Sequence, residues 1–114
     1  MNPAARIYVA GHQGMVGSAL VRALNSRGYR NLVVRTRTEL DLLDQTAVRR
    51  FFSTERPAYV FLAAARVGGI LANSRQPARF LADNLTIALN VIQAAQEARV
   101  LDSGPRRYQS MAVR

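Results

Sequence analysis

Three glycines, Gly11, Gly14 and Gly17, stand three residues apart, directly after a short run of β-branched and aromatic residues. Glycine at such positions permits a tight turn, lets the backbone approach a pyrophosphate, and lets the following helix pack closely on the strand. The phosphates would meet free N–H groups and the positive end of the helix dipole. The spacing therefore indicates a dinucleotide-binding loop. The alternative is a strand-to-helix turn that merely tolerates glycine.

Two arginines, Arg35 and Arg37, follow the second β-rich run. At this point a dinucleotide-binding fold has an acid for the ribose 2′-hydroxyl of NAD, or an arginine for the 2′-phosphate of NADP. The first acid here is Glu39, and a guanidinium pairs well with phosphate. We therefore expect NADP(H) as cofactor and Arg37 as its 2′-phosphate ligand. An ordinary solvated strand end is the alternative for both arginines.

Two further segments could border the adenosine. Asp41 and Leu42 follow the arginines closely, although Asp41 could equally cap a turn. The run 63–65 consists of three alanines at the end of the third β-rich run. Such small side chains allow either a ribose or a neighbouring helix to approach closely.

The composition excludes several kinds of catalytic chemistry. The 114 residues contain no cysteine and no lysine, and histidine occurs once, as His12. Disulfides, zinc ribbons, iron–sulfur clusters, cysteine nucleophiles and catalytic lysines are therefore excluded within this chain. We expect no metal site and no catalytic residue. We interpret His12 as a loop residue that lies near the cofactor phosphates or faces solvent.

All sixteen basic residues are arginine, and with seven acids they give a net charge of +9. Such a charge is typical of proteins that bind nucleic acid or acidic ligands. The arginines are scattered, however, and aromatic residues do not interleave with them as a base-stacking surface requires. We therefore expect an anionic small ligand and no nucleic acid. A nucleic-acid-binding domain is the weaker alternative, and it predicts steeply salt-dependent binding.

Strands and helices alternate along the sequence. Short β-rich runs predict strands at 6–10, 31–35 and 59–64. Apolar residues at helical spacing predict three helices: one at about 15–27, ended by Gly28; one after Asp44, ended by Pro57; and one from Pro77 to about residue 99. The order β-α-β-α-β-α predicts an α/β fold, a partial Rossmann-type doubly wound parallel sheet of three strands with right-handed crossovers.

Residues 101–114 differ in character from the rest. They are polar and basic, and Gly104 and Pro105 interrupt them. We expect no strand there and interpret the segment as a disordered tail. No apolar run is long enough to cross a bilayer, and the first residues do not read as a secretory signal. A cytoplasmic location without a membrane partner is the resulting expectation.

Three segments together resemble one family. They are AGHQGMVGS at 10–18, RTRTELDLLD at 35–44 and LAAARVGGI at 62–70. They closely resemble the GDP-L-fucose synthases, which are extended short-chain dehydrogenases/reductases with NADP-dependent 3,5-epimerase and 4-reductase activity. Asn84 and the segment 90–95 are also similar to the family. The resemblance covers roughly residues 5–100 and implies an NADP-binding Rossmann half-domain there, followed by a non-family tail at 101–114.

The resemblance implies roles for particular residues. The cofactor-binding residues that it implies are Gly11, Gly14, Met15, Val16 and Gly17 in the loop, with Arg37, Leu42 and Ala64; His12 and Gln13 lie within the same loop. Members often carry arginine where this chain has Gln13, so one phosphate contact of the family is expected to be absent. A GDP-sugar would be the substrate of the complete enzyme.

The resemblance also implies what this chain lacks. The family has a catalytic Tyr-x-x-x-Lys pair, in which the tyrosine protonates the carbonyl oxygen, and a cysteine and a histidine for epimerisation. Here Tyr108 is followed four residues later by Ala112. We therefore expect an amino-terminal fragment that is inactive alone. A non-catalytic NADP(H) sensor, or a fragment of another sugar-nucleotide epimerase or dehydratase, is the alternative.

A fragment of this kind should have an incomplete sheet. In the usual strand order the fourth strand lies beside the first, so we expect the first strand to be an exposed edge. An exposed edge and a bare apolar face predict marginal stability. They also predict self-association, or a partner chain that completes the sheet.

Overall fold

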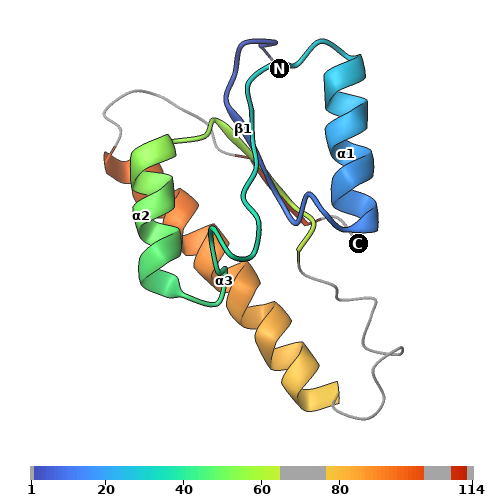
Figure 1. Ribbon diagram of the computed structural model, residues 1–114. Helices are drawn as coiled ribbons and strands as arrows, with labels where there is room; N and C mark the ends of the chain where they lie inside the picture. The colour runs from blue at the N-terminus through green and yellow to red at the C-terminus, as the bar shows by residue number, and fades with distance from the viewer. Residues whose placement is uncertain (1, 65–76, 102–108, 113–114) are drawn as a thin grey trace.

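The computed structural model describes residues 2–64, 77–101 and 109–112 (Figure 1). The elements are β1 (Ile7–Ala10), α1 (Met15–Ser26), β2 (Leu32–Val33), α2 (Gln45–Glu55), β3 (Tyr59–Leu62), α3 (Pro77–Leu101) and β4 (Gln109–Ala112). All strand pairs are parallel, and the sheet order is β2-β1-β3-β4. The predicted Rossmann-type α/β fold, with its three amino-terminal strands in parallel, is confirmed.

Side chains along β1 alternate between two core clusters. Tyr8 and Ala10 lie in the cluster that includes residues of α2 and α3, whereas Ile7 and Val9 lie in the cluster that contains Leu24 of α1. Figure 1 shows α1 on one side of the sheet and α2 and α3 on the other. Helices thus cover both faces, as a parallel sheet requires, and the doubly wound arrangement is confirmed.

Glycine ends α1 as predicted. Gly28 has φ +90°, and its N–H donates to the carbonyl of Asn25. The N–H of Tyr29 donates to the carbonyl of Leu24. Together these two bonds form a Schellman motif, with Tyr29 packed on the cluster that contains Leu24. The chain therefore leaves α1 in the direction that leads it into β2.

An aspartate begins α2 as predicted. The Asp44 carboxylate accepts from the N–H of Ala47 at 3.2 Å, a side-chain N-cap. The buried face of α2 presents Phe51 and Phe52 to Tyr8 of β1, with ring centroids 4.6 and 5.7 Å from the Tyr8 ring. Tilted and edge-on rings at these separations add to the energy of apolar burial. This contact fixes α2 on the sheet.

All three predicted strands are shorter in the structure, the first by one residue only. The second covers Leu32–Val33 because the chain leaves the sheet there to form a turn at 36–40. The third covers Tyr59–Leu62, although the N–H of Ala63 still donates to the carbonyl of Ala10 at 2.9 Å. The ends of β1 and β3 therefore remain side by side beyond the strand itself.

The expectation that the first strand is an exposed edge is wrong. Ile7 of β1 aligns with Leu32 of β2 on one side and with Tyr59 of β3 on the other. The connection through α2 carries the chain back across β1 to its free edge, so the third strand fills the place assigned to a missing fourth one. The sheet order therefore reverses at β1.

The expectation of no strand after residue 100 is also wrong, since Gln109–Ala112 form β4. This strand pairs in parallel with β3, Tyr59 aligned with Gln109 and Leu62 with Ala112. Edge pairing needs only backbone donors and acceptors, so a polar segment can supply it. The predicted disorder of 102–108 and 113–114, including Tyr108, lies outside the described residues. Within the described part of the chain, no helix is long and apolar enough to cross a membrane.

Candidate functional site

The glycine loop leads from the end of β1 into α1. Gly11 has φ +84°, which favours glycine, and its carbonyl accepts from the N–H of Gly14 at 3.1 Å. Gly14 is the N-cap of α1 and provides no side-chain hydrogen bond to the first turn. The first N–H groups of a helix have no partner within the helix. The first turn of α1 therefore offers free donors and the positive end of the helix dipole.

Two glycines in this loop lie where no side chain fits. A Cβ on Gly11 would be 2.8 Å from the backbone nitrogen of Ala64, just after β3. A Cβ on Gly17 would overlap the carbonyl oxygen of Gly11 and lie 2.9 Å from the Cα of His12. Gly11 therefore permits close approach to the end of β3, and Gly17 permits α1 to pack closely on the loop that follows β1.

The place of the loop in the sheet matters for binding. It lies at the carboxyl ends of β1 and β3, where the strand order reverses and α1 and α2 cover opposite faces. Ligands of open α/β sheets bind in the crevice at this point. Gly11 and Ala64, which the sequence assigned separately to the cofactor, are in direct backbone proximity here.

The other loop residues differ in exposure. Met15 is 88% exposed and Gln13 is exposed, whereas Val16 and His12 are half-buried. The Nδ1 atom of His12 is buried and has no hydrogen-bond partner among the described residues. His12 is therefore not simply solvent-facing. Its unpartnered ring nitrogen and the bare helix terminus together fit a site that takes a polar ligand.

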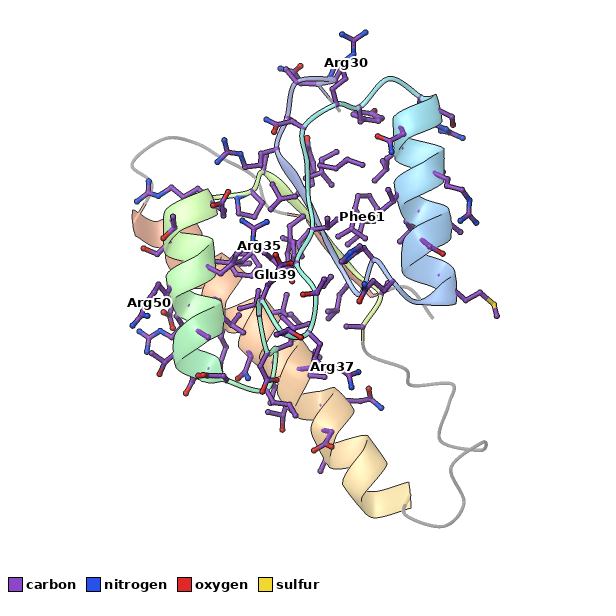
Figure 2. All side chains as sticks on the ribbon, in the orientation of Figure 1. Arg30, Arg35, Arg37, Glu39, Arg50 and Phe61 are labelled. Atoms are coloured by element: carbon purple, nitrogen blue, oxygen red, sulfur yellow. The ribbon has the colours of Figure 1, made fainter. Side chains whose placement is uncertain are left out.

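The two candidate arginines have different surroundings. The Arg35 guanidinium donates to the carbonyl of Val34 at 2.8 Å, pairs with Glu55 at 3.5 Å, and lies 5.3 Å from the Phe51 ring centroid. Arg37 is exposed and makes no ion pair or hydrogen bond with the described residues. Figure 2 shows Arg37 apart from Arg35. Arg35 therefore anchors the end of β2 on α2, and Arg37 is available to a ligand.

Arg37 lies in a closed turn that the sequence analysis missed. The N–H of Thr36 donates to the Glu39 carboxylate at 2.8 Å, and the N–H of Glu39 donates to the Thr36 hydroxyl at 3.2 Å. These reciprocal bonds are a capping box, and the signal for it was Thr followed three residues later by Glu. The hydrogen bonds from Thr36 lower the pKa of Glu39, and the charges of Arg35 and His12 lower it further.

The segment after this turn is fixed to α3. The side-chain amide of Asn90 donates to the carbonyl of Leu42 at 2.9 Å, and Leu42 packs on the core cluster of α2 and α3. Asp41 accepts from the N–H of Leu43 at 3.0 Å. Of the two roles considered for Asp41, the structure shows the turn cap. Asn90 is a positioning residue that the sequence analysis had noted only as part of the resemblance.

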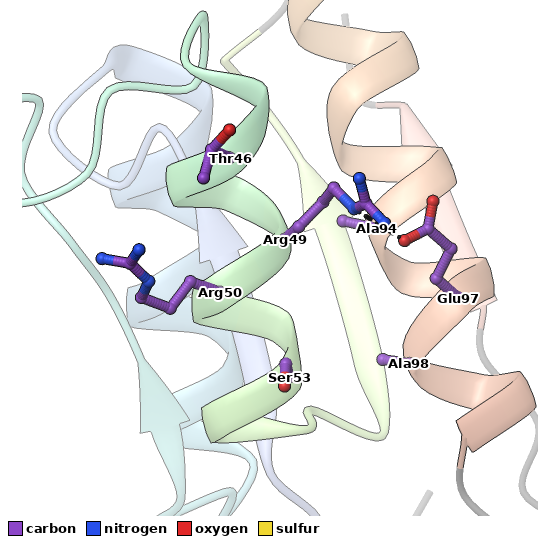
Figure 3. Close-up of a pocket in the computed structure, with 7 residues that line it drawn as sticks. All are labelled: Thr46, Arg49, Arg50, Ser53, Ala94, Glu97 and Ala98. Carbon is purple, nitrogen blue, oxygen red and sulfur yellow. Dashed lines mark hydrogen bonds and ion pairs between the residues drawn. The ribbon is translucent and has the colours of Figure 1, made fainter.

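A groove lies elsewhere, between α2 and α3 (Figure 3). Its volume is about 340 Å³, and its lining residues are Thr46, Arg49, Arg50, Ser53, Ala94, Glu97 and Ala98. An ion pair between Arg49 and Glu97 spans it at 2.8 Å. No residue of the glycine loop lines this groove. It is therefore a surface feature of helix packing rather than part of the crevice.

Residues 7–109 match the NAD dependent epimerase/dehydratase family. This chain belongs to that family. It is 57% identical over 93 residues to GDP-L-fucose synthase 1 of Arabidopsis thaliana, and 54% identical over 92 residues to the GDP-L-fucose synthase of Escherichia coli (strain K12). These alignments cover 82% and 81% of this chain but 29% of each relative. The chain thus matches the amino-terminal NAD(P)-binding part of these enzymes and spans less than a third of their length.

Solved structures of this family agree with the fold. A GDP-D-glycero-L-gluco-heptose synthase from Campylobacter jejuni, determined in the presence of NADPH, is 48% identical, with a TM-score of 0.81 over 88% of this chain and 29% of that one. A GDP-mannoheptose C4 reductase from the same organism, with NADP bound, is 42% identical, with a TM-score of 0.73 over 86% of this chain and 31% of that one. Family homologues of this chain therefore bind NADP(H).

Proposed function

We propose that the chain binds NADP(H) at the glycine loop. The observation that carries the proposal is the close approach of Gly11 to Ala64 beside the uncapped first turn of α1. That arrangement gives a diphosphate free N–H donors and no side chain in its way. The Nδ1 atom of His12, which has no hydrogen-bond partner in the described part of the chain, is consistent with a polar ligand at the same place.

Each residue that the sequence analysis assigned to the cofactor has a role in this proposal. The diphosphate would be held by the loop residues Gly11, His12, Gln13, Gly14, Met15, Val16 and Gly17. Arg37 would pair with the 2′-phosphate, and Leu42 and Ala64 would border the adenosine. When bound, NADP(H) supplies or accepts a hydride. This chain's part is to bind and orient the cofactor.

We further propose that the chain is the cofactor-binding part of a GDP-L-fucose synthase. A complete enzyme of that type would convert GDP-4-keto-6-deoxy-mannose to GDP-L-fucose, and only the complete enzyme would bind the GDP-sugar. Alone, this chain would be inactive because it has no lysine or cysteine and its one histidine is in the glycine loop. Its place of action would be the cytoplasm.

We also propose that the chain self-associates or binds a partner chain. Leu85, Leu89 and Ile92 occupy successive turns of α3, and each is about half exposed. Apolar side chains gathered on one helix face are typical of a surface that another chain covers. The edges of the described sheet are β2 and β4 rather than β1, so a partner that extends the sheet would pair with one of these two strands.

Calorimetric titration of the purified chain with NADPH and with NADH tests the proposed function. We expect saturable binding of both, and tighter binding of NADPH, since only NADPH offers a phosphate to Arg37. Arg37→Ala should remove the preference. Arg30→Ala is the matched control, because Arg30 is an exposed arginine at the opposite end of β2 (Figure 2). No binding, or equal affinity for the two cofactors, would contradict the proposal.

A further inference from the structure

The turn that carries Arg37 is closed by its own side chains. Thr36 is the N-cap and Glu39 the third residue, and each satisfies the backbone N–H of the other, at 2.8 and 3.2 Å. The carbonyl of Thr36 also accepts from the N–H groups of Glu39 at 3.0 Å and Leu40 at 2.9 Å. A single helical turn is unstable by itself. These four bonds are what hold it together.

Both ends of this turn are fixed to the body of the protein. Before it, Arg35 pairs with Glu55 of α2 and stacks over Phe51. After it, Leu40 is buried in the core cluster of α2 and α3. Between these anchors, Arg37 and Thr38 are exposed. The anchors fix where the turn lies, and the capping box fixes how its backbone is folded.

We propose that Thr36 and Glu39 are positioning residues that set the preference of this chain for NADPH over NADH by holding Arg37 towards the 2′-phosphate. The inference rests on the proposed function, since it requires the cofactor to bind at the glycine loop. A ligand's affinity falls in proportion to the fraction of the protein in the binding-competent state. If the turn opened, Arg37 would adopt many conformations. Its contact with the 2′-phosphate would then weaken, whereas the contacts of the glycine loop with the cofactor would not change.

The part that Glu39 plays in the turn needs its acceptor oxygen and not its charge. The carboxylate accepts from the N–H of Thr36 at 2.8 Å, and this hydrogen bond, the largest cause, lowers the pKa of Glu39, so the side chain stays ionised. The negative charge itself does not favour a phosphate nearby. Glutamine has the same acceptor oxygen without the charge, so Glu39→Gln should preserve the turn.

Four variants test whether the capping box, rather than any other feature of the turn, sets the preference for NADPH. Thr36→Val and Glu39→Ala each remove one acceptor, and the loss of a cap should reduce NADPH affinity about fivefold. NADH affinity should stay within about twofold, because NADH has no group for Arg37 to bind. Glu39→Gln should retain the preference. Thr38→Val is the matched control, as Thr38 is exposed in the same turn and takes no part in the box.

The decisive measurement repeats the variants in the Arg37→Ala background. If Thr36 and Glu39 act through Arg37, Thr36→Val and Glu39→Ala should not change the ratio of the two affinities there. Equal weakening of both cofactors, an unchanged ratio, or a change that persists without Arg37 would overturn the inference. Failure of the proposed function is seen separately, in the unsubstituted chain, as no binding or no preference, and it overturns this inference as well.

Amide hydrogen exchange in the cofactor-free chain gives a second test, independent of affinity. The amides of Glu39 and Leu40 donate within the turn, so Thr36→Val should speed their exchange, while the amides of α1 should be unchanged. Thr38→Val should leave all of them unchanged. Exchange at Glu39 and Leu40 that is equally fast in every variant would overturn the inference.

Discussion

The side-chain amide of Asn90 donates to the backbone carbonyl of Leu42 at 2.9 Å, joining residues 48 positions apart. Asn90 lies in the middle of α3 and is 7% exposed, whereas Leu42 lies in the connection that follows the Arg37 turn. Leu42 is half-buried, and a carbonyl in such an irregular segment has no donor from a helix or a sheet. Asn90 supplies that donor and ties the predicted adenosine border to the core.

Replacing Asn90 with alanine should therefore destabilise the chain by about 1 kcal/mol, the net contribution of a typical hydrogen bond, since this one is only partly buried. Urea denaturation followed by circular dichroism measures the change. Gln93→Ala is the control, because Gln93 is an exposed amide one turn further along α3. Equal midpoints for the two variants would show that the bond to Leu42 contributes nothing to stability.

Gly11 and Gly28 allow the two costs of adding a side chain to be separated. Both have positive φ, at +84° and +90°, but a Cβ on Gly11 meets the Ala64 backbone at 2.8 Å, while nothing lies within 4 Å of a Cβ on Gly28. Gly28→Ala should cost about 1 kcal/mol for the backbone conformation, and Gly11→Ala should cost about 1–3 kcal/mol more for the overlap.

Thermal unfolding of the two glycine variants, without cofactor, measures this difference. Gly11→Ala should also abolish NADPH binding in calorimetry. The loop can make room for the new side chain only by moving away from β3, and this movement would displace the residues proposed to bind the diphosphate. Gly28→Ala should bind as the unsubstituted chain does. Similar stabilities for the two variants would mean that the loop moves away from Ala64 at no cost.

Stability should fall in alkali because of Tyr8. Burial raises the pKa of the Tyr8 hydroxyl above its ordinary value, and the nearby charge of Arg35 only partly opposes this. Above about pH 10 the unfolded state loses this proton and the folded state keeps it. The free energy of unfolding should therefore be constant below that pH, as far as Tyr8 is concerned, and fall above it by up to about 1.4 kcal/mol per pH unit.

The composition makes this alkaline effect unusually easy to assign. The chain has no lysine and no cysteine, so tyrosine is the only side-chain type that ordinarily titrates near pH 10. Tyr8→Phe should flatten the fall in urea midpoint between about pH 9 and 11, and Tyr59→Phe, a half-buried position in β3, is the control. An unchanged slope in Tyr8→Phe would contradict the assignment to this residue.

Local signals in the sequence were enough to predict where α1 ends, where α2 begins and where the glycine loop lies. Asp44 before α2, Gly28 after α1 and the glycine spacing each act through a bond or a close approach within a few residues. The position of the third strand depends instead on which edge of β1 the chain returns to. That choice is made by packing α2 and α3 on one face, and no short motif encodes it.

In the candidate site, too, features set by neighbouring residues can be predicted from the sequence, and features set by packing between distant elements cannot. The capping box of Thr36 and Glu39 is readable from two residues three apart in the sequence, because both of its bonds are local. The separation of Arg35 from Arg37 was not readable, because it depends on Glu55 and Phe51 of α2 meeting only one of them. The assignment of the cofactor-binding residues themselves stays a prediction.

The pairing of β4 with β3 makes a final prediction about the carboxyl-terminal segment. Four residue pairs align, from Tyr59 with Gln109 to Leu62 with Ala112, so a chain that ends at residue 108 should leave the β3 edge unpaired. Its midpoint of thermal unfolding should fall, and light scattering should show association that increases with concentration, because a free strand edge pairs with other chains. A chain that ends at residue 112 keeps β4 and is the control. If both shortened chains unfold and associate alike, β4 does not protect the sheet, and the edge of β3 must be stable without it.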